Sequence, residues 1–360
     1  MIKEDKIKIQ GEVDLGTTIA YNDNVKGKMP LVLLIAGTGN LDRDGNSKVI
    51  KLNLYKDLSD HFVNQGCVCV RYDKRGTHES TGNYSKNSLT NLVDDAKTIL
   101  DYCKDLPNVD SNRVIVCGHS EGTMIATLLS EKTDVDGLIL LSGAGVSLKE
   151  AMHYQNDIVI NEAKNGKGFL YWLLRKTAKP EKVHKQVEDI YKKAENCKKD
   201  RFFFQGAFLG TKYMQEHNSR TGDDYIEILR NYKGKVLAIT GTKDLQVDYT
   251  KLDKLKDLEN IETFSPEGVN HILREVDDNN SILNVQKQYK RLSKEPLHTK
   301  TMDFISNWLG KNFEREQSNE RFNNASQKEQ EQIKTSTQVK TKKVKKLNNE
   351  ELDQGFESEL

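Results

Sequence analysis

Short apolar runs recur along the chain, and turn-forming residues follow most of them. Such runs are typical of strands buried on both faces of a parallel sheet. They lie at residues 31–35, 67–72, 114–117, 138–141, 236–240 and 261–264. Ahead of them, Ile7, Ile9 and Val13 alternate with polar residues, which predicts an edge strand, and a second strand is expected around 17–21.

Helical patterns separate these strands, and the clearest lies between residues 88 and 106. Ser88 is a good N-cap residue and Pro107 lies just beyond the expected end. The apolar residues of this segment fall on one helical stripe: Leu89, Leu92, Val93, Ala96, Ile99, Leu100 and Cys103. Strands that alternate with amphipathic helices predict a mostly parallel sheet flanked by helices, with ligands bound beyond the carboxyl ends of the strands.

The alternation breaks over residues 146–232, which are rich in Lys and Glu and helical in pattern. This segment also carries aromatic clusters at 169–172 and 202–204. An insertion of this length between two strands indicates a helical cap or lid, and an ordinary crossover with long helices is the alternative. We therefore expect a core formed by residues 1–145 and 233–310, with the lid between its two parts.

The composition changes after a last amphipathic helix around 302–309. Residues 311–360 contain few apolar side chains, so we expect a disordered charged tail. A lysine-rich run at 340–346 is compatible with contact to anionic lipid or RNA, but the acidic stretch that follows favours a solvated tail. A tail of this kind is available to an unknown partner.

The net charge and the cysteines indicate which partners and which cellular location to expect. The net charge of +1 gives no support for nucleic-acid binding. Five cysteines are present, and Cys67 and Cys69 alternate with valines, which favours core positions over a metal-binding pair. Reduced thiols predict a cytoplasmic protein. The charged N-terminus has no signal-peptide pattern, and no apolar run is long enough to span a membrane.

The sequence Gly118-His119-Ser120-Glu121-Gly122 follows the apolar run 114–117 and precedes a helical pattern. A Gly-x-Ser-x-Gly motif between a strand and a helix is the nucleophile elbow, in which a sharp turn projects the serine from the sheet edge. Ser120 is therefore the candidate nucleophile. A glycine-rich turn with a solvent-exposed serine is the alternative.

A serine hydroxyl needs a general base, and in this motif's fold the acid and the histidine follow the serine in that order. Asp244 follows the run 236–240 and His271 follows the run 261–264, so we expect Asp244 to orient His271. Asp248 is the alternative acid and His298 the alternative base.

The oxyanion of a tetrahedral intermediate needs hydrogen-bond donors. One is expected to be the backbone N–H of Glu121, the residue after the nucleophile. The other is expected from the loop after the run 31–35, where Thr38 is the first choice and Gly39 the second.

With these motifs, the chain resembles the α/β-hydrolase superfamily over residues 6–310, most closely bacterial esterases related to the serine aminopeptidase and acyl-peptidase-like branch. The loop that contains Thr38 and the block Asp42-Arg43-Asp44-Gly45 behind it are similar to that group. The block Asp73-Lys74-Arg75-Gly76 resembles an Asp-x-Arg-Gly turn of such hydrolases, although His78 stands where a second glycine is usual. For Asp42, Arg43, Asp73 and Arg75 we expect local ion pairing, and for His78 a surface position.

The predicted function is hydrolysis of carboxylic esters by a Ser-His-Asp triad through an acyl-enzyme, with a small-molecule ester or acyl substrate as partner. The aromatic clusters of the insertion favour an apolar acyl group. A peptidase or amidase acting on small peptides is the alternative enzyme, and a non-catalytic binding protein of the same fold is the alternative of another class. No cofactor or metal is predicted, because no phosphate loop, dinucleotide fingerprint or zinc spacing occurs.

Overall fold

A computed structural model of the chain describes residues 1–177, 179–276 and 280–313. Residues 1–308 form one compact unit, and residues 309–360 form a second, of which only the end of the last helix is described. The predicted disordered tail therefore lies outside the described residues from position 314 onward.

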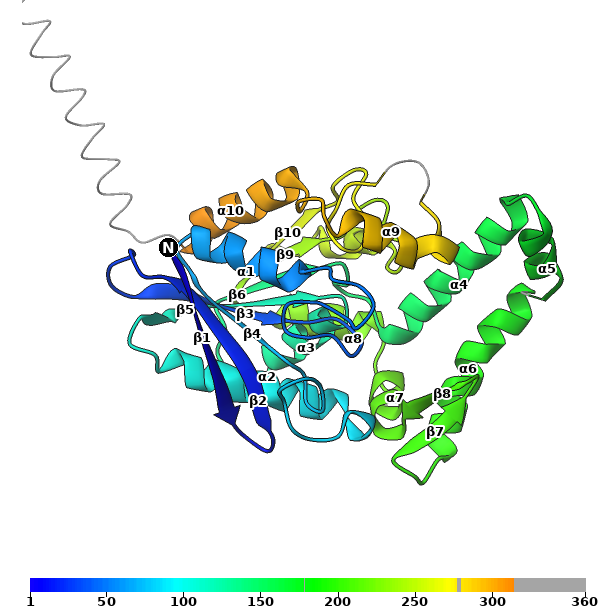
Figure 1. The fold of residues 1–360 in the computed structure, drawn as a ribbon, viewed down its shortest axis with the longest axis horizontal. Helices are drawn as coiled ribbons and strands as arrows, with labels where there is room; N and C mark the ends of the chain where they lie inside the picture. Colours follow the sequence, from blue (N-terminus) through cyan, green and yellow to red (C-terminus); the bar gives the residue numbers. More distant parts are fainter. Residues whose placement is uncertain (178, 277–279, 314–360) are drawn as a thin grey trace, which may run out of the picture. The chain divides into compact units, whose positions relative to one another are not determined.

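One eight-stranded sheet forms the centre of the first unit (Figure 1). The order of its strands is β1-β2-β4-β3-β5-β6-β9-β10. The pairs β1–β2 and β2–β4 are antiparallel and all the other neighbouring pairs are parallel, so the predicted mostly parallel sheet is confirmed. The strands are β1 (Ile2–Gln10), β2 (Asp14–Asn22), β3 (Met29–Ile35), β4 (Val68–Tyr72), β5 (Val109–His119), β6 (Gly137–Leu141), β9 (Lys235–Ile239) and β10 (Ile261–Phe264).

Helices cover both faces of this sheet (Figure 1). One face carries α1 (Leu54–Asn64) and α10 (Thr299–Phe313), and the other carries α2 (Leu89–Lys104), α3 (Glu121–Leu129) and α8 (Gly222–Asn231). The predicted cap of α2 is present, because the Ser88 side chain accepts a hydrogen bond from the N–H of Asn91.

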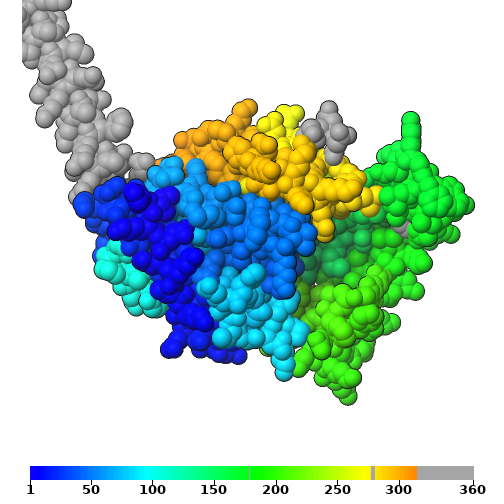
Figure 2. All heavy atoms as spheres, in the orientation of Figure 1, coloured from blue at the N-terminus to red at the C-terminus, as the bar shows by residue number. Residues whose placement is uncertain are grey.

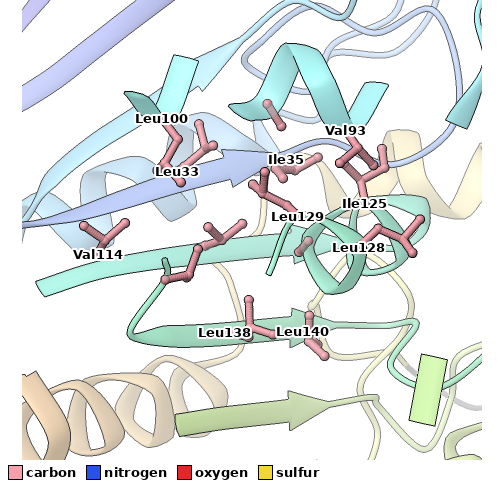
Figure 3. Close-up of a cluster of buried hydrophobic side chains, with 14 of the residues drawn as sticks. Leu33, Ile35, Val93, Leu100, Val114, Ile125, Leu128, Leu129, Leu138 and Leu140 are labelled. Carbon is pink, nitrogen blue, oxygen red and sulfur yellow. The ribbon is translucent and has the colours of Figure 1, made fainter. Parts of the chain in front are cut away.

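The core between the sheet and α2 and α3 consists mainly of branched aliphatic side chains (Figure 3). Leu33 and Ile35 of β3 and Leu138 of β6 lie opposite Val93 of α2 and Ile125 of α3, and all are buried. Burying one such side chain contributes about 1.5–3 kcal/mol. This packing fixes where β5 ends and α3 begins, which is where the predicted elbow lies.

The segment between β6 and β9 contains most of the remaining elements. Helix α4 begins with a capping box formed by Ser147 and Glu150. The elements are α4 (Leu148–Asn165), α5 (Phe169–Thr177), α6 (Pro180–Asn196), β7 (Arg201–Phe204), β8 (Ala207–Gly210), α7 (Thr211–Asn218) and α8. We call residues 146–232 the insertion. Part of it has a small core of its own, formed by Val187, Tyr191, Ala194, Phe202 and Met214, whereas Tyr225, Ile226 and Leu229 of α8 belong to the main core.

The aromatic cluster at 202–204 was expected within a helical segment, and this expectation is wrong. These phenylalanines form β7 and pair with β8 in a hairpin. Its two turn residues, Gln205 and Gly206, both have positive φ, at 45° and 88°. That conformation matches the two-residue turn that suits a hairpin's twist, and aromatic residues favour strands.

Three 3-10 helices and one further α-helix complete the described chain: η1 (Tyr84–Lys86), η2 (Tyr249–Leu255), η3 (Ile282–Asn284) and α9 (Val285–Leu292). Among the helices of the described residues, none is both long and apolar enough to cross a membrane.

Candidate active site

Ser120 occupies the sharp turn between β5 and α3. Its φ of 55° and ψ of −122° depart from the conformations that non-glycine residues usually adopt, and such strain is frequent at active sites. The two motif glycines allow the turn, because a Cβ on Gly118 would lie 2.1 Å from the carbonyl oxygen of Gly122. A Cβ on Gly122 would lie 2.1 Å from the carbonyl oxygen of Ile35. The predicted strand–turn–helix is therefore present.

His271 and Asp244 lie on loops that follow β10 and β9, and the fold brings them together. His271 Nδ1 donates a hydrogen bond to Asp244 Oδ2 at 2.8 Å, and both side chains are buried. Asp244 Oδ1 accepts hydrogen bonds from the backbone N–H groups of Gln246 and Val247 at 2.8 and 3.0 Å. The carboxylate is held from both sides, so it fixes the tautomer that leaves His271 Nε2 with a lone pair.

The alternative acid and base have other contacts. Asp248 accepts a hydrogen bond from the N–H of Thr250 and caps η2. His298 Nδ1 lies 2.9 Å from the hydroxyl oxygen of Thr301, one turn further along the chain. Neither lines the cavity described next.

A cavity of about 500 Å³ is lined by Ser120 and His271, together with Thr38 and Glu121. In Figure 2 the surface recedes between α9 and the insertion, and residues of α9 and α4 are part of the cavity wall. Most of the wall is apolar, as in small-molecule sites generally. This apolar part includes Leu41, Leu54, Met124, Val146, Met152 and Ile272.

The aromatic clusters of the insertion do not form this wall, contrary to the expectation from the sequence. Phe169, Trp172 and Phe203 are exposed, because they lie on α5 and on the β7–β8 hairpin. The apolar character of the cavity comes instead from aliphatic side chains of the core loops and of α4.

A buried ion pair connects the side chain of Glu121 to the peptide that precedes Thr38, and these are the two residues whose backbone N–H groups are predicted to hold an oxyanion. Lys74 Nζ donates to Glu121 Oε2 at 2.5 Å and to the carbonyl oxygen of Gly37 at 2.9 Å. In a trans peptide the N–H points away from the C=O, so anchoring the Gly37 carbonyl fixes the direction of the Thr38 N–H. Lys74 thus contacts both Glu121 and the peptide that precedes Thr38.

The insertion completes the surroundings of Glu121. The Tyr213 hydroxyl of α7 donates a hydrogen bond to Glu121 Oε1, and His217 Nε2 lies 3.5 Å from the same atom. Burial by itself would raise the pKa of Glu121, but the Lys74 charge and His217 hold this pKa well below its ordinary value. The carboxylate is therefore charged.

A second set of hydrogen bonds connects the loop after β3 with the histidine loop. The N–H of Gly37 donates to the Tyr55 oxygen at 2.7 Å, Tyr55 Oη lies 3.1 Å from His119 Nδ1, and His119 Nε2 lies 2.8 Å from the carbonyl oxygen of His271. An amide N–H only donates and a carbonyl only accepts, so the directions are fixed. His119 must carry its proton on Nε2 and accept from the Tyr55 hydroxyl on Nδ1.

Burial, followed by the neighbouring His271 ring, lowers the pKa of His119 to about 3. Burial also raises the pKa of Tyr55. Both groups are therefore neutral near pH 7, as these hydrogen bonds require.

Of the charged residues near the site, Arg43, Asp73 and Arg75 make the expected ion pairs, whereas among the described residues Asp42 makes none. Arg43 Nη2 lies 2.7 Å from Asp73 Oδ2, and Arg75 Nη2 lies 2.6 Å from Asp95 Oδ1. The Asp42 carboxylate accepts backbone N–H groups of its own loop. His78 is exposed, in agreement with the expected surface position.

Sequence reasoning missed Lys74, Tyr55 and Tyr213. Lys74 stands at the variable position of the Asp-x-Arg-Gly block, which was the only signal available for it. In residues 1–177, 179–276 and 280–313, no three His, Cys, Asp or Glu side chains converge as a metal site would require.

This sheet order, the elbow at Ser120 and the loops after β9 and β10 define an α/β hydrolase. Residues 51–257, more than half of the chain, match the model of the family described as serine aminopeptidase, S33, and the chain belongs to that family. Over 129 residues it is 28% identical to Esterase EstD of Thermotoga maritima. That match covers 36% of this chain and only 30% of the relative's length.

Solved structures show the same fold. An esterase of Pyrococcus furiosus is 13% identical with a TM-score of 0.52, covering 87% of this chain and 92% of its own. Est1E of Butyrivibrio proteoclasticus, solved with ferulic acid, is 19% identical with a TM-score of 0.50, covering 81% of this chain and 98% of its own.

Proposed function

We propose that the protein is a serine hydrolase that cleaves carboxylic esters through an acyl-enzyme. One observation carries the proposal: the hydrogen-bonded pair Asp244–His271 lies at the cavity in which Ser120 stands on a strained elbow. The related esterases support the same chemistry.

In the proposed mechanism, His271 Nε2 takes the proton of the Ser120 hydroxyl as its oxygen attacks the ester carbonyl carbon. The N–H groups of Glu121 and Thr38 stabilise the oxyanion, with Gly39 as the alternative to Thr38. The protonated His271 gives its proton to the leaving alcohol and then deprotonates a water molecule, which hydrolyses the acyl-enzyme. Asp244 stays ionised and stabilises the imidazolium.

An ester substrate fits the cavity better than a peptide with a free amino terminus. An aminopeptidase needs a carboxylate to bind the substrate's ammonium group. Among the described residues that line the cavity, Glu121 supplies the one carboxylate, and Lys74 and Tyr213 already occupy its oxygens. The aliphatic wall supports an apolar acyl group of small to medium size.

We further propose that the insertion acts as a cap over the cavity. Tyr154 and Gln155 of α4 donate hydrogen bonds to the backbone oxygens of Asp244 and Gln246, so the insertion contacts the loop of the catalytic acid. A cytoplasmic location is supported by the five cysteines, all of which are free thiols.

Labelling by a fluorophosphonate probe and hydrolysis of aryl esters test this function. The wild type should be labelled and active, whereas Ser120→Ala and His271→Ala should lose both properties. Equal labelling of Ser120→Ala would refute the assignment, and an inactive, unlabelled wild type would favour the non-catalytic binding protein. Faster turnover of aminoacyl anilides than of aryl esters would favour the peptidase.

A further inference from the structure

Helix α5 exposes an unusual group of apolar side chains. Phe169 and Trp172 are 76% and 49% exposed, their rings stack at 5.7 Å, and Leu170 and Leu173 are exposed beside them. Helix α5 has no buried residue. Contiguous apolar surface of this kind on a folded protein marks an interaction site.

Basic residues are frequent in the sequence on both sides of this apolar group. Between residues 164 and 185 the sequence has seven basic residues and one acidic residue, Glu181. All seven are exposed, and within the part of the chain that the structure describes none of them forms an ion pair with a carboxylate. They are Lys164, Lys167, Arg175, Lys176, Lys179, Lys182 and Lys185.

We propose that α5 docks the protein onto the surface of an anionic lipid bilayer. An apolar helix face with cations on its flanks is the composition of segments that lie in the headgroup region, and tryptophan favours that depth. The cations gain energy from anionic lipids. No helix of the described residues spans a bilayer, so the contact is peripheral.

The place of α5 in the fold suits contact with a flat surface. It joins α4 to α6 at the end of the insertion that lies farthest from the central sheet (Figure 1). In Figure 2 this part of the insertion stands out beyond the core as the outer green edge. A bilayer can therefore meet α5 before it meets the sheet or its flanking helices.

Docking also has a consequence for the cavity, which rests on the proposed function. Helix α4 begins beside the cavity, where Leu148 and Met152 line the wall, and its other end leads to α5. One helix therefore connects the lipid surface to the site, which favours esters whose acyl chains partition into the bilayer.

The two tryptophans make docking measurable. Trp172 is half-exposed, whereas Trp308 is 2% exposed and already shielded from water. The full-length chain is mixed with phosphatidylcholine vesicles, with or without phosphatidylglycerol, and both sedimentation and tryptophan emission are recorded. We expect co-sedimentation and a blue shift with anionic vesicles, and weaker binding at high salt.

Substitutions separate α5 from other parts of the chain. Phe169→Ser with Leu170→Ser, and separately Lys176→Glu with Lys179→Glu, should each weaken vesicle binding by about tenfold or more. The matched control is Phe203→Ser with Phe208→Ser, which removes another exposed aromatic pair of the insertion and should leave binding unchanged. Ser120→Ala should bind like the wild type, so a failure of the proposed chemistry is distinguishable from a failure of docking.

Three results would overturn the proposal. They are no sedimentation with anionic vesicles, no change in Trp172 emission on binding, and vesicle binding that survives both α5 variants but disappears when the lysines at 340–346 are replaced by serine. Unchanged hydrolysis of a water-soluble aryl ester by each α5 variant verifies that it is folded.

Discussion

His119 holds the backbone of His271: its Nε2 lies 2.8 Å from the His271 carbonyl oxygen, and both residues are buried. The residue before the candidate nucleophile therefore positions the loop of the candidate base. Through Tyr55, the same ring is connected to the N–H of Gly37. The neutral His119 ring thus contacts the loop of His271 directly and the loop of Gly37 through Tyr55.

Replacing His119 by Phe should lower kcat by about 10–100-fold with little change in KM, because the His271 carbonyl loses the shorter of its two hydrogen bonds and keeps that from Ser142. The Tyr55 hydroxyl and the His271 carbonyl would each lose a partner, at a cost of about 1–3 kcal/mol in stability. His119→Gln supplies one amide donor and should recover part of kcat. Kinetics of aryl ester hydrolysis check this, and equal loss in both variants would contradict a role for the hydrogen bond.

The lowered pKa of His119 also predicts a pH dependence of stability. The unfolded chain binds a proton at this residue below about 6.5, whereas the folded chain does so only near 3. The stabilisation is therefore present above about pH 6.5 and is lost as the pH falls toward 3. Urea midpoints measured between pH 7 and pH 5 should fall less steeply for His119→Gln than for the wild type. Parallel slopes would contradict the assignment.

Lys74→Met should destabilise the protein by about 3–5 kcal/mol, because it leaves the Glu121 carboxylate buried without its cation. The double variant Lys74→Met with Glu121→Gln removes both charges and should recover much of this stability. It should still lose up to about 10²-fold in kcat, because the Gly37 carbonyl has no donor and the Thr38 N–H is no longer fixed.

A boronic acid that mimics the tetrahedral intermediate gives a second measure of the Lys74 effect. Its affinity for the double variant should fall in proportion to kcat/KM, whereas KM for the ester should change little. If the double variant binds the boronic acid as tightly as the wild type, Lys74 does not position the Thr38 N–H.

Asp244→Asn should reduce kcat by about 10²–10⁴-fold, since an amide in place of the carboxylate no longer selects the His271 tautomer or stabilises its charge. Asp248→Asn is the matched control: asparagine also caps helices, and the Asp248 carboxylate accepts its hydrogen bonds from Thr250 in its own turn. If the two substitutions have equal effects on kcat, Asp244 is not the orienting acid.

Gly122→Ala should lower the melting temperature markedly, because the added Cβ would lie 2.1 Å from the carbonyl oxygen of Ile35. Either β3 or the start of α3 must move, and Ser120 moves with α3. Thermal unfolding and fluorophosphonate labelling measure the two effects. A variant with unchanged melting temperature and labelling would show that the elbow does not need a glycine at this position.

Local sequence patterns predicted the elements and the elbow because both depend on residues close together in the chain. The order Ser120, Asp244, His271 could be predicted because each of these residues follows a strand of the same parallel sheet. Lys74, Tyr55 and Tyr213 were not, because their partners lie 37, 64 and 92 positions away and their own segments carry no pattern that reports such contacts.

The aromatic clusters were interpreted wrongly for a related reason. An apolar run in a helical segment gives no indication whether it faces a cavity, a core or the solvent. In the folded chain, Phe202 lies in the small core of the insertion and Phe203 lies on the surface of a hairpin. Phe169 and Trp172 lie on an exposed helix. Only the packing of neighbouring segments distinguishes these environments.

Strands β6 and β9 are neighbours in the sheet, with Leu138 beside Val236, although almost one hundred residues separate them in sequence. The polypeptide leaves the sheet after β6 and returns to it at the neighbouring strand β9. The hydrogen-bond register of these two strands therefore does not depend on the segment that connects them. Evolution can therefore lengthen, shorten or replace α4 to α7 while Ser120 keeps its hydrogen bond to Leu141. The same feature offers protein engineers two splice points, ahead of α4 and ahead of α8, for exchanging substrate preference between hydrolases.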